Sequence, residues 1–250
     1  MTDTEFFEFA LRMGDNALIL GQQVSAWCGH APALEEDIAL ANTALDLIGQ
    51  SKLWLTLAGE VENNSRSADA LAYLRDARAF RNCLLVEQPN GDFGSTLMRQ
   101  FLFDAWHAPM LTALTQSSEK RVAEIAAKAA KEAAYHFDRS RDLVIRLGDG
   151  TGESHERMQR ALDVLYPFQG ELTAPDSVDL ALGARGVAPE LAAVKADVDR
   201  LTLDALKEAT LTAPSGPLRK GGKTGLHSEG LGRILSDLQF LQRAYPGASW

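Results

Sequence analysis

Residues 119–150 read EKRVAEIAAKAAKEAAYHFDRSRDLVIRLGDG and carry the clearest helical pattern of the chain. Small, apolar and a few polar residues recur there in alternating steps of four and three: Val122, Ala126, Ala129, Ala133, His136, Ser140, Leu143 and Leu147. This spacing places the whole row on one face of an amphipathic helix. The segment therefore predicts a long helix, ended by the GDG turn, whose buried face carries a histidine.

Three further segments, about 6–27, 34–55 and 95–115, show the same spacing, and no segment alternates as a half-buried strand does. Their predicted inward rows are Phe6, Ala10, Met13, Ala17, Leu20, Val24 and Trp27; Leu34, Ile38, Ala41, Leu45, Ile48, Lys52 and Leu55; and Leu97, Phe101, Asp104, Ala108, Leu111 and Thr115. Four long helices joined by short or moderate connections predict an all-α four-helix bundle. Shorter helical segments follow it.

The chain shows no shift in composition that marks a domain boundary. We therefore expect a single helical domain over residues 1–250, with a core bundle over about 5–148 and additional C-terminal helices over 149–250. The hydrophobic content of 46% is ample for a core and excludes a disordered chain.

The net charge and the number of cysteines indicate which binding partners and which cellular compartment the sequence favours. The formal charge is 25 − 34 = −9, which disfavours nucleic acid as a partner. No apolar run approaches the roughly 18 residues that a membrane span needs, so no membrane association is expected. Cys28 and Cys83 are too few for a disulfide scaffold, and no secretory signal precedes them. These features favour the reducing cytoplasm.

Long four-helix bundles often hold a di-metal site, with one Glu from each of two helices and a Glu-x-x-His pair from each of the others. Carboxylate and imidazole ligands suit iron or manganese. This chain offers fragments of that set. Asp104 and His107 are three positions apart, and Glu132 and His136 are four apart.

The remaining ligand positions depart from the set. Asn42 and Asp46 flank the second predicted row, while Gly49 stands where another histidine is wanted. Lys52 on an inward row would repel a metal ion and neutralise buried carboxylates in its place. Spacing alone leaves three interpretations open: an ordinary polar network, a degenerate di-metal site, and a working one.

The stretch GGKTG, residues 221–225, ends like a phosphate-binding loop. The required first glycine falls at Pro217, however, and no strand precedes the stretch. Nucleotide hydrolysis is therefore rejected. Arg219, Lys220 and Lys223 form a basic, flexible patch suited to an acidic partner surface or to a phosphate-bearing ligand such as coenzyme A. A solvated loop is the alternative.

Six strings together resemble the family of phenylacetyl-CoA epoxidase C subunits: WCGHAPALEEDIALANTALDLIGQ, NCLLVEQPNGDF, DAWH, KEAAYH, RKGGKTGLHSEGLG and LQFLQRAYPGASW. The resemblance runs from about Phe6 to Trp250. It implies a ferritin-like helical fold and a structural, non-catalytic subunit of a cytoplasmic oxygenase of phenylacetate degradation.

The resemblance also implies the partners. A homologous A subunit holds the di-iron centre and binds the CoA thioester, so no cofactor is expected in this chain. Further small subunits and an NADPH-dependent reductase complete the complex, which converts phenylacetyl-CoA to its ring 1,2-epoxide. The rival interpretation is a free-standing di-iron oxidase that uses Asp46, Asp104, His107, Glu132 and His136.

Overall fold

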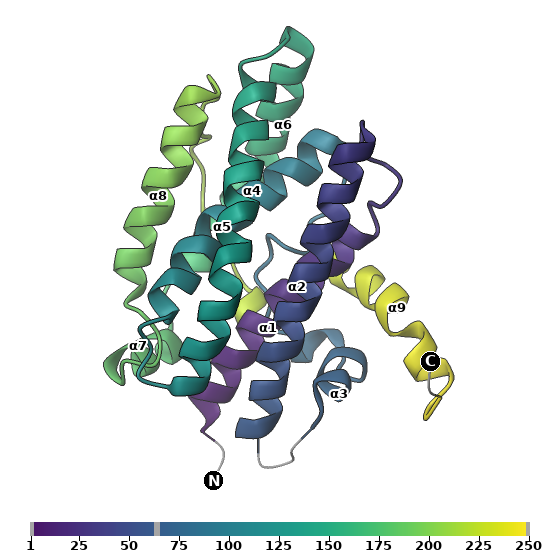
Figure 1. The fold of residues 1–250 in the computed structure, drawn as a ribbon, viewed down its shortest axis with the longest axis vertical. Helices are drawn as coiled ribbons and strands as arrows, with labels where there is room; N and C mark the ends of the chain where they lie inside the picture. Colours follow the sequence, from purple (N-terminus) through teal and green to yellow (C-terminus); the bar gives the residue numbers. More distant parts are fainter. Residues whose placement is uncertain (1–2, 63–65, 249–250) are drawn as a thin grey trace. The chain divides into compact units, whose positions relative to one another are not determined.

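The computed structural model describes residues 3–62 and 66–248, and every regular element among them is helical (Figure 1). The α-helices are α1 Thr4–Ser25, α2 Leu34–Val61, α3 Ala68–Tyr73, α4 Phe93–Leu114, α5 Lys120–Gly148, α6 Gly152–Gln169, α7 Ser177–Ala184, α8 Leu191–Glu208 and α9 Glu229–Ala244. Short 3-10 turns are η1 Ala77–Ala79, η2 Gly170–Thr173 and η3 Gly222–Thr224. The predicted all-α class is confirmed. Among residues 3–62 and 66–248, none of the helices combines the length and the apolar content that a membrane span requires.

The chain divides into two compact units, which are described separately. The first unit comprises 1–89 and 221–250, and the second comprises 90–220. Two of the predicted long helices, α1 and α2, belong to the first unit, and α4 and α5 belong to the second. The expectation of a single domain over residues 1–250 stays a prediction.

In the first unit, α1 and α2 pack side by side in antiparallel order (Figure 1). Asp3 caps α1 by accepting a hydrogen bond from the Phe6 amide at 3.1 Å. Glycines on α1 permit the close approach: a Cβ at Gly14 would lie 2.7 Å from Leu55, and one at Gly21 would lie 3.2 Å from Ile48. The row predicted for α1 is buried from Phe6 to Val24, whereas Trp27 lies beyond the helix and is half-buried.

The prediction that one row of α2 faces inward is wrong for most residues of that row. Leu34 is 71% exposed, Ile38 53%, Leu45 67% and Ile48 40%. Lys52 is exposed as well. The buried face instead carries Leu40, Ala44, Leu47, Trp54 and Ala58. The helix is apolar around most of its circumference, so two rows have the same spacing, and packing against α1 selects the second.

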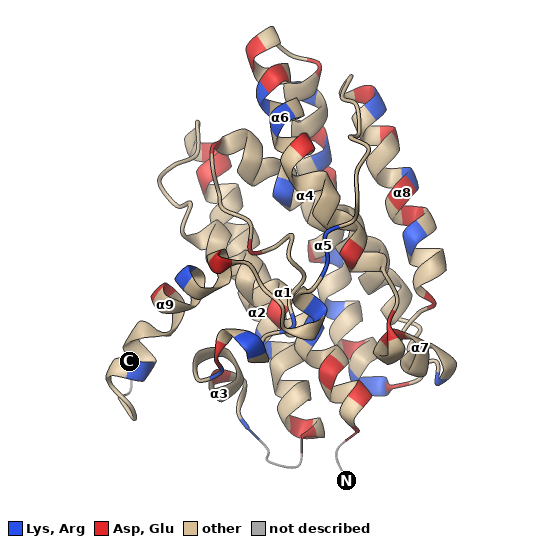
Figure 2. Cartoon of the chain, turned by 180° about the vertical axis from the view of Figure 1, so that it is seen from behind, with Lys and Arg blue, Asp and Glu red and all other residues tan. Residues whose placement is uncertain are grey.

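In the second unit, α4 packs against α5, and α6 and α8 pack against α4. Phe101 of α4 and Phe137 of α5 stack with ring centroids 6.2 Å apart. Charges of both signs alternate along α6 and α8, as Figure 2 shows. Exposed pairs such as Glu153 with Arg157 and Lys195 with Asp199 lie one turn apart. Each contributes about 0.3–0.5 kcal/mol at most, so burial of the apolar faces holds these helices.

Candidate functional site

Asp104 on α4 is the centre of a buried polar cluster in the second unit. Its side chain is fully buried. Gln100, one turn earlier on α4, donates from Nε2 to Oδ1 at 2.7 Å. The hydroxyl of Ser140 on α5 donates to Oδ2 at 2.8 Å. Both carboxylate oxygens therefore accept hydrogen bonds from neutral side chains.

Burial shifts the protonation of this cluster. Loss of hydration raises the pKa of Asp104 from 3.8 to about 6, although the charge of His136 and the bonds from Ser140 and Gln100 oppose the rise. Burial also lowers the pKa of His107 to about 3, assisted by the nearby charge of His136. At neutral pH, Asp104 is therefore mostly ionised and His107 is neutral.

The structure brings together three of the predicted ligands, Asp104, His107 and His136, all of them buried. Glu132 lies half-buried one turn before His136 on α5. The four α2 candidates lie in the first unit: Asn42, Gly49 and Lys52 are exposed, and Asp46 is half-buried. The inward position predicted for Lys52 is therefore wrong, because its helix turns that face to the solvent.

The residues of the cluster do not fit a di-iron centre, which uses four Glu and two His side chains. The buried cluster supplies one carboxylate, Asp104, whose two oxygens accept hydrogen bonds from Gln100 and Ser140. The ring of His107 packs on two aromatic rings, Phe103 at 4.8 Å and Trp106 at 5.7 Å between centroids. Over residues 3–62 and 66–248, no three or more His, Cys, Asp or Glu side chains form a group that could hold a metal ion.

Asp104→Asn is expected to change how stability depends on pH. The folded-state pKa of Asp104 lies above its unfolded value, so the folded chain holds this proton more tightly and loses stability as pH rises from about 4 to about 6. The asparagine of the variant has no such proton to lose. The free energy of unfolding of Asp104→Asn, taken relative to that of the native chain, should therefore rise by about 2 kcal/mol between about pH 4 and about pH 7.

Urea unfolding at a series of pH values measures that difference. Asp163→Asn, at an exposed carboxyl on α6, is the matched control, and its free energy of unfolding should depend on pH as that of the native chain does. If the free energy of unfolding of Asp104→Asn also followed the pH dependence of the native chain, the Asp104 carboxyl would not be buried as described.

The basic tail is divided between the two units. Arg219 and Lys220 belong to the second unit and Lys223 to the first. The amide of Arg219 donates to the carbonyl of Pro167 at 2.9 Å, and its guanidinium lies 5.3 Å from the ring centre of Phe168. Arg219 is thus held against α6, and contact of the three side chains with a phosphate or a partner stays a prediction.

The glycine-rich stretch has a structural role that the sequence did not reveal. We call residues 221–230 the clasp, because they close over the 80–88 loop of the first unit. The ring of His227 meets two acceptors, with Nδ1 2.8 Å from Glu87 Oε2 and Nε2 3.1 Å from the Phe80 carbonyl. The Ser228 amide donates to Glu87 Oε1 at 2.6 Å. Two acceptors require that both ring nitrogens carry hydrogen, as in imidazolium.

The surroundings of His227 agree with that geometry. Burial by itself lowers the pKa of His227, but the hydrogen bonds to Glu87 and to the Phe80 carbonyl outweigh it and raise the pKa above its ordinary value. The stabilisation from this pair is therefore fully present below about pH 6.5 and is lost as pH rises through the raised pKa.

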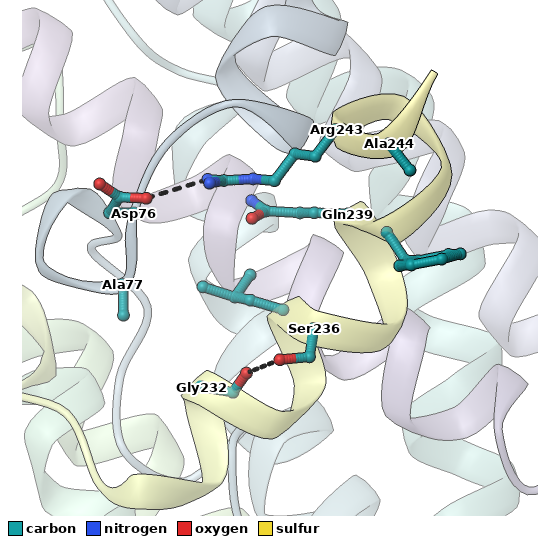
Figure 3. Close-up of a pocket in the computed structure, with 9 residues that line it drawn as sticks. Asp76, Ala77, Gly232, Ser236, Gln239, Arg243 and Ala244 are labelled. Atoms are coloured by element: carbon teal, nitrogen blue, oxygen red, sulfur yellow. Dashed lines mark hydrogen bonds and ion pairs between the residues drawn. The ribbon is translucent and has the colours of Figure 1, made fainter. Parts of the chain in front are cut away.

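A groove of about 560 Å³ lies beside α9 in the first unit (Figure 3). Arg243 pairs with Asp76 across it at 3.0 Å, and the Ser236 hydroxyl donates to the Gly232 carbonyl at 2.9 Å. The charged and hydroxyl side chains that line the groove, those of Asp76, Arg243 and Ser236, are therefore engaged with one another or with the backbone. The lining holds neither a histidine nor a cysteine. We assign no chemistry to this groove.

Comparison with known proteins gives two results. A family model described as "Phenylacetic acid catabolic protein" matches residues 1–250. The chain is also 46% identical to the C subunit of the 1,2-phenylacetyl-CoA epoxidase of Escherichia coli (strain K12), over 243 residues that cover 97% of this chain and 98% of that protein. Both agree with the resemblance seen in the sequence, and the all-helical structure is consistent with the ferritin-like fold expected for that family.

Proposed function

Because the chain belongs to the phenylacetic acid catabolic protein family, we propose that it is the C subunit of a phenylacetyl-CoA epoxidase and that it supports the catalytic A subunit without holding iron itself. On this proposal, the A subunit holds the di-iron centre and binds the CoA thioester. Small subunits and an NADPH-dependent reductase complete the assembly.

One observation carries the non-catalytic part of the proposal. The carboxylate best placed to bind a metal, Asp104, accepts its hydrogen bonds from Gln100 and Ser140, which are neutral donors. Each carboxylate oxygen keeps a second lone pair, so the hydrogen bonds by themselves leave room for a metal. The donor set is what falls short: the buried cluster brings one carboxylate, Asp104, to His107 and His136, where a di-iron bundle supplies four Glu and two His, and this is expected of a bundle that no longer holds metal.

Such a subunit contributes by holding the catalytic subunit in its active arrangement. A helical face that buries apolar area against the catalytic chain can hold the metal-bearing helices of that chain in register. The subunit then affects turnover without contacting the reacting atoms. The epoxidation itself, with its oxygen and its electrons, belongs to the other subunits.

Reconstitution of the epoxidase from purified subunits tests this function. With A, the small subunits, the reductase, NADPH and phenylacetyl-CoA present, omission of this chain should reduce epoxide formation to background. Addition of the Asp104→Asn variant should restore it. Full turnover by the A subunit without this chain would contradict the scaffold, and turnover by this chain with the reductase alone would establish the rival di-iron oxidase.

A further inference from the structure

Asn90 and Gly91 form an asparagine–glycine pair in the loop that leads into α4. In this pair, the side-chain amide of asparagine can react with the next backbone nitrogen to form a cyclic imide. Glycine hinders this reaction least, because it has no side chain beside its nitrogen. Neither residue belongs to a helix, Asn90 is half-buried and Gly91 is exposed, so water reaches the pair. The loop therefore carries a chemically labile amide at the surface of the second unit.

The contacts of the loop keep this pair together. Gly91 has a φ of +64°, in the left-handed region, and a Cβ there would lie 2.9 Å from the Cβ of Ser95. Asn90 supplies two acceptors to α4. Its Oδ1 accepts from the Arg99 guanidinium at 2.6 Å, and its backbone carbonyl accepts from the Thr96 hydroxyl at 2.8 Å. The fold thus holds a side-chain carbonyl next to an obligatory glycine.

The Gly91 amide nitrogen is the group that would attack. Among residues 3–62 and 66–248, no backbone carbonyl accepts a hydrogen bond from it. Its reaction therefore breaks no hydrogen bond of the backbone. When this nitrogen attacks Cγ of Asn90, negative charge develops on Oδ1, which is the atom that Arg99 contacts. A guanidinium in that place stabilises the developing charge.

The reaction needs only water. The Gly91 nitrogen bonds to Cγ of Asn90, and the bond between Cγ and the side-chain nitrogen breaks. That side-chain nitrogen takes the amide proton and leaves as ammonia. Water then opens the imide at either carbonyl, and the resulting acid loses its proton. The net change replaces a neutral amide by a carboxylate, with no oxidant or reductant.

Arg99 is suited to bind that carboxylate. Its side chain is fully buried, and loss of hydration lowers the pKa of the guanidinium from 12.5 to about 9, so it is still charged at neutral pH. A nearby negative charge therefore stabilises it. Hydrogen bonds from a guanidinium to a carboxylate are roughly twice as strong as those between neutral groups. Residue 90 also lies just before the first turn of α4, where the helix dipole favours a negative charge.

We propose that Asn90 is a site of spontaneous deamidation and that Arg99 binds the carboxylate product, so that the modification tightens the attachment of the loop to α4. The modified chain carries one more negative charge at the start of the helix that holds Asp104.

Peptide mass spectrometry of the purified full-length chain tests the modification. After several days at about pH 8, where Arg99 is still charged, the peptide that contains Asn90 should become about 1 Da heavier. Asn42 is the matched control. It is exposed but is followed by the β-branched Thr43, so its peptide should keep its mass. An unchanged mass at Asn90, or an equal gain at Asn42, would overturn the proposal.

Asn90→Asp reproduces the carboxylate and tests the role of Arg99. In urea unfolding at neutral pH, its folding equilibrium constant should exceed that of the freshly purified native chain by about tenfold, because an ion pair replaces a neutral acceptor. The gain should disappear as pH falls below about 4, where the carboxylate binds a proton. Asn42→Asp, on α2, should show no such gain. A less stable Asn90→Asp chain, or a gain that persists at low pH, would contradict binding by Arg99.

Discussion

Asp15→Ala is expected to lower the free energy of unfolding by about 3–5 kcal/mol, because it leaves a buried guanidinium without its counter-ion. Asp15 lies on α1 with its side chain fully buried, and Arg75, whose side chain is 3% exposed, donates to both of its carboxylate oxygens. The Arg81 amide donates to Asp15 as well, at 2.8 Å. The carboxylate therefore fixes α1 to the 75–81 segment.

Arg75 has little freedom to escape once Asp15 is removed. Its guanidinium also donates to the Ala79 carbonyl at 2.9 Å and lies 4.2 Å from the ring centre of Phe80. The charge thus stays buried in the variant, and its lost interaction is not replaced by water.

Urea unfolding followed by circular dichroism measures the effect, with Glu8→Ala as the matched control. Glu8 is also on α1 and also pairs with an arginine, Arg81, but both of these side chains are about one-fifth exposed. Its removal should cost about 1 kcal/mol or less. Equal losses for the two variants would show that burial does not set the strength of the Asp15 pair.

Gly222→Ala is expected to destabilise the chain by about 3 kcal/mol, because the clasp approaches the 80–88 loop too closely for a side chain. A Cβ at Gly222 would lie 2.1 Å from the Asn82 carbonyl oxygen and 3.1 Å from two backbone carbons. These are backbone atoms, which cannot turn aside as the end of a flexible side chain can. The clasp must therefore lift from the loop.

Gly232→Ala provides the control from the same part of the chain. It lies on α9, and a Cβ there would meet nothing within 4 Å. Alanine should stabilise that helix by about 0.5–1 kcal/mol. Thermal unfolding should therefore shift in opposite directions for the two variants. A Gly222→Ala protein as stable as Gly232→Ala would contradict the packing of the clasp.

The helices were predictable from the sequence because their spacing is a local property. The orientation of α2 was not, since Leu34 and Leu40 belong to apolar rows of the same spacing and packing against α1 decides which of the two is buried. Within the site, Asp104 and His136 were expected on inward rows and both are buried. Gln100 was missed, although its position one turn before Asp104 is a recognisable signal.

The clasp could not be foreseen, because its partners are far away in the sequence. Glu87 and His227 are 140 positions apart, and the local sequence GGKTGLHSEG does not indicate which loop the clasp will contact. The likeness to a phosphate loop arises because both structures need backbone without side chains at a point of close approach. In the clasp, that approach is to the chain itself.

We propose that hydrogen bonds among side chains of this chain hold the Asp104 cluster together in place of a metal. The most direct test is the iron content of the purified chain after expression with added iron, determined by elemental analysis against protein concentration. We predict far less than one iron per chain and no change on Asp104→Asn. Close to two irons per chain, reduced by Asp104→Asn, would contradict the account.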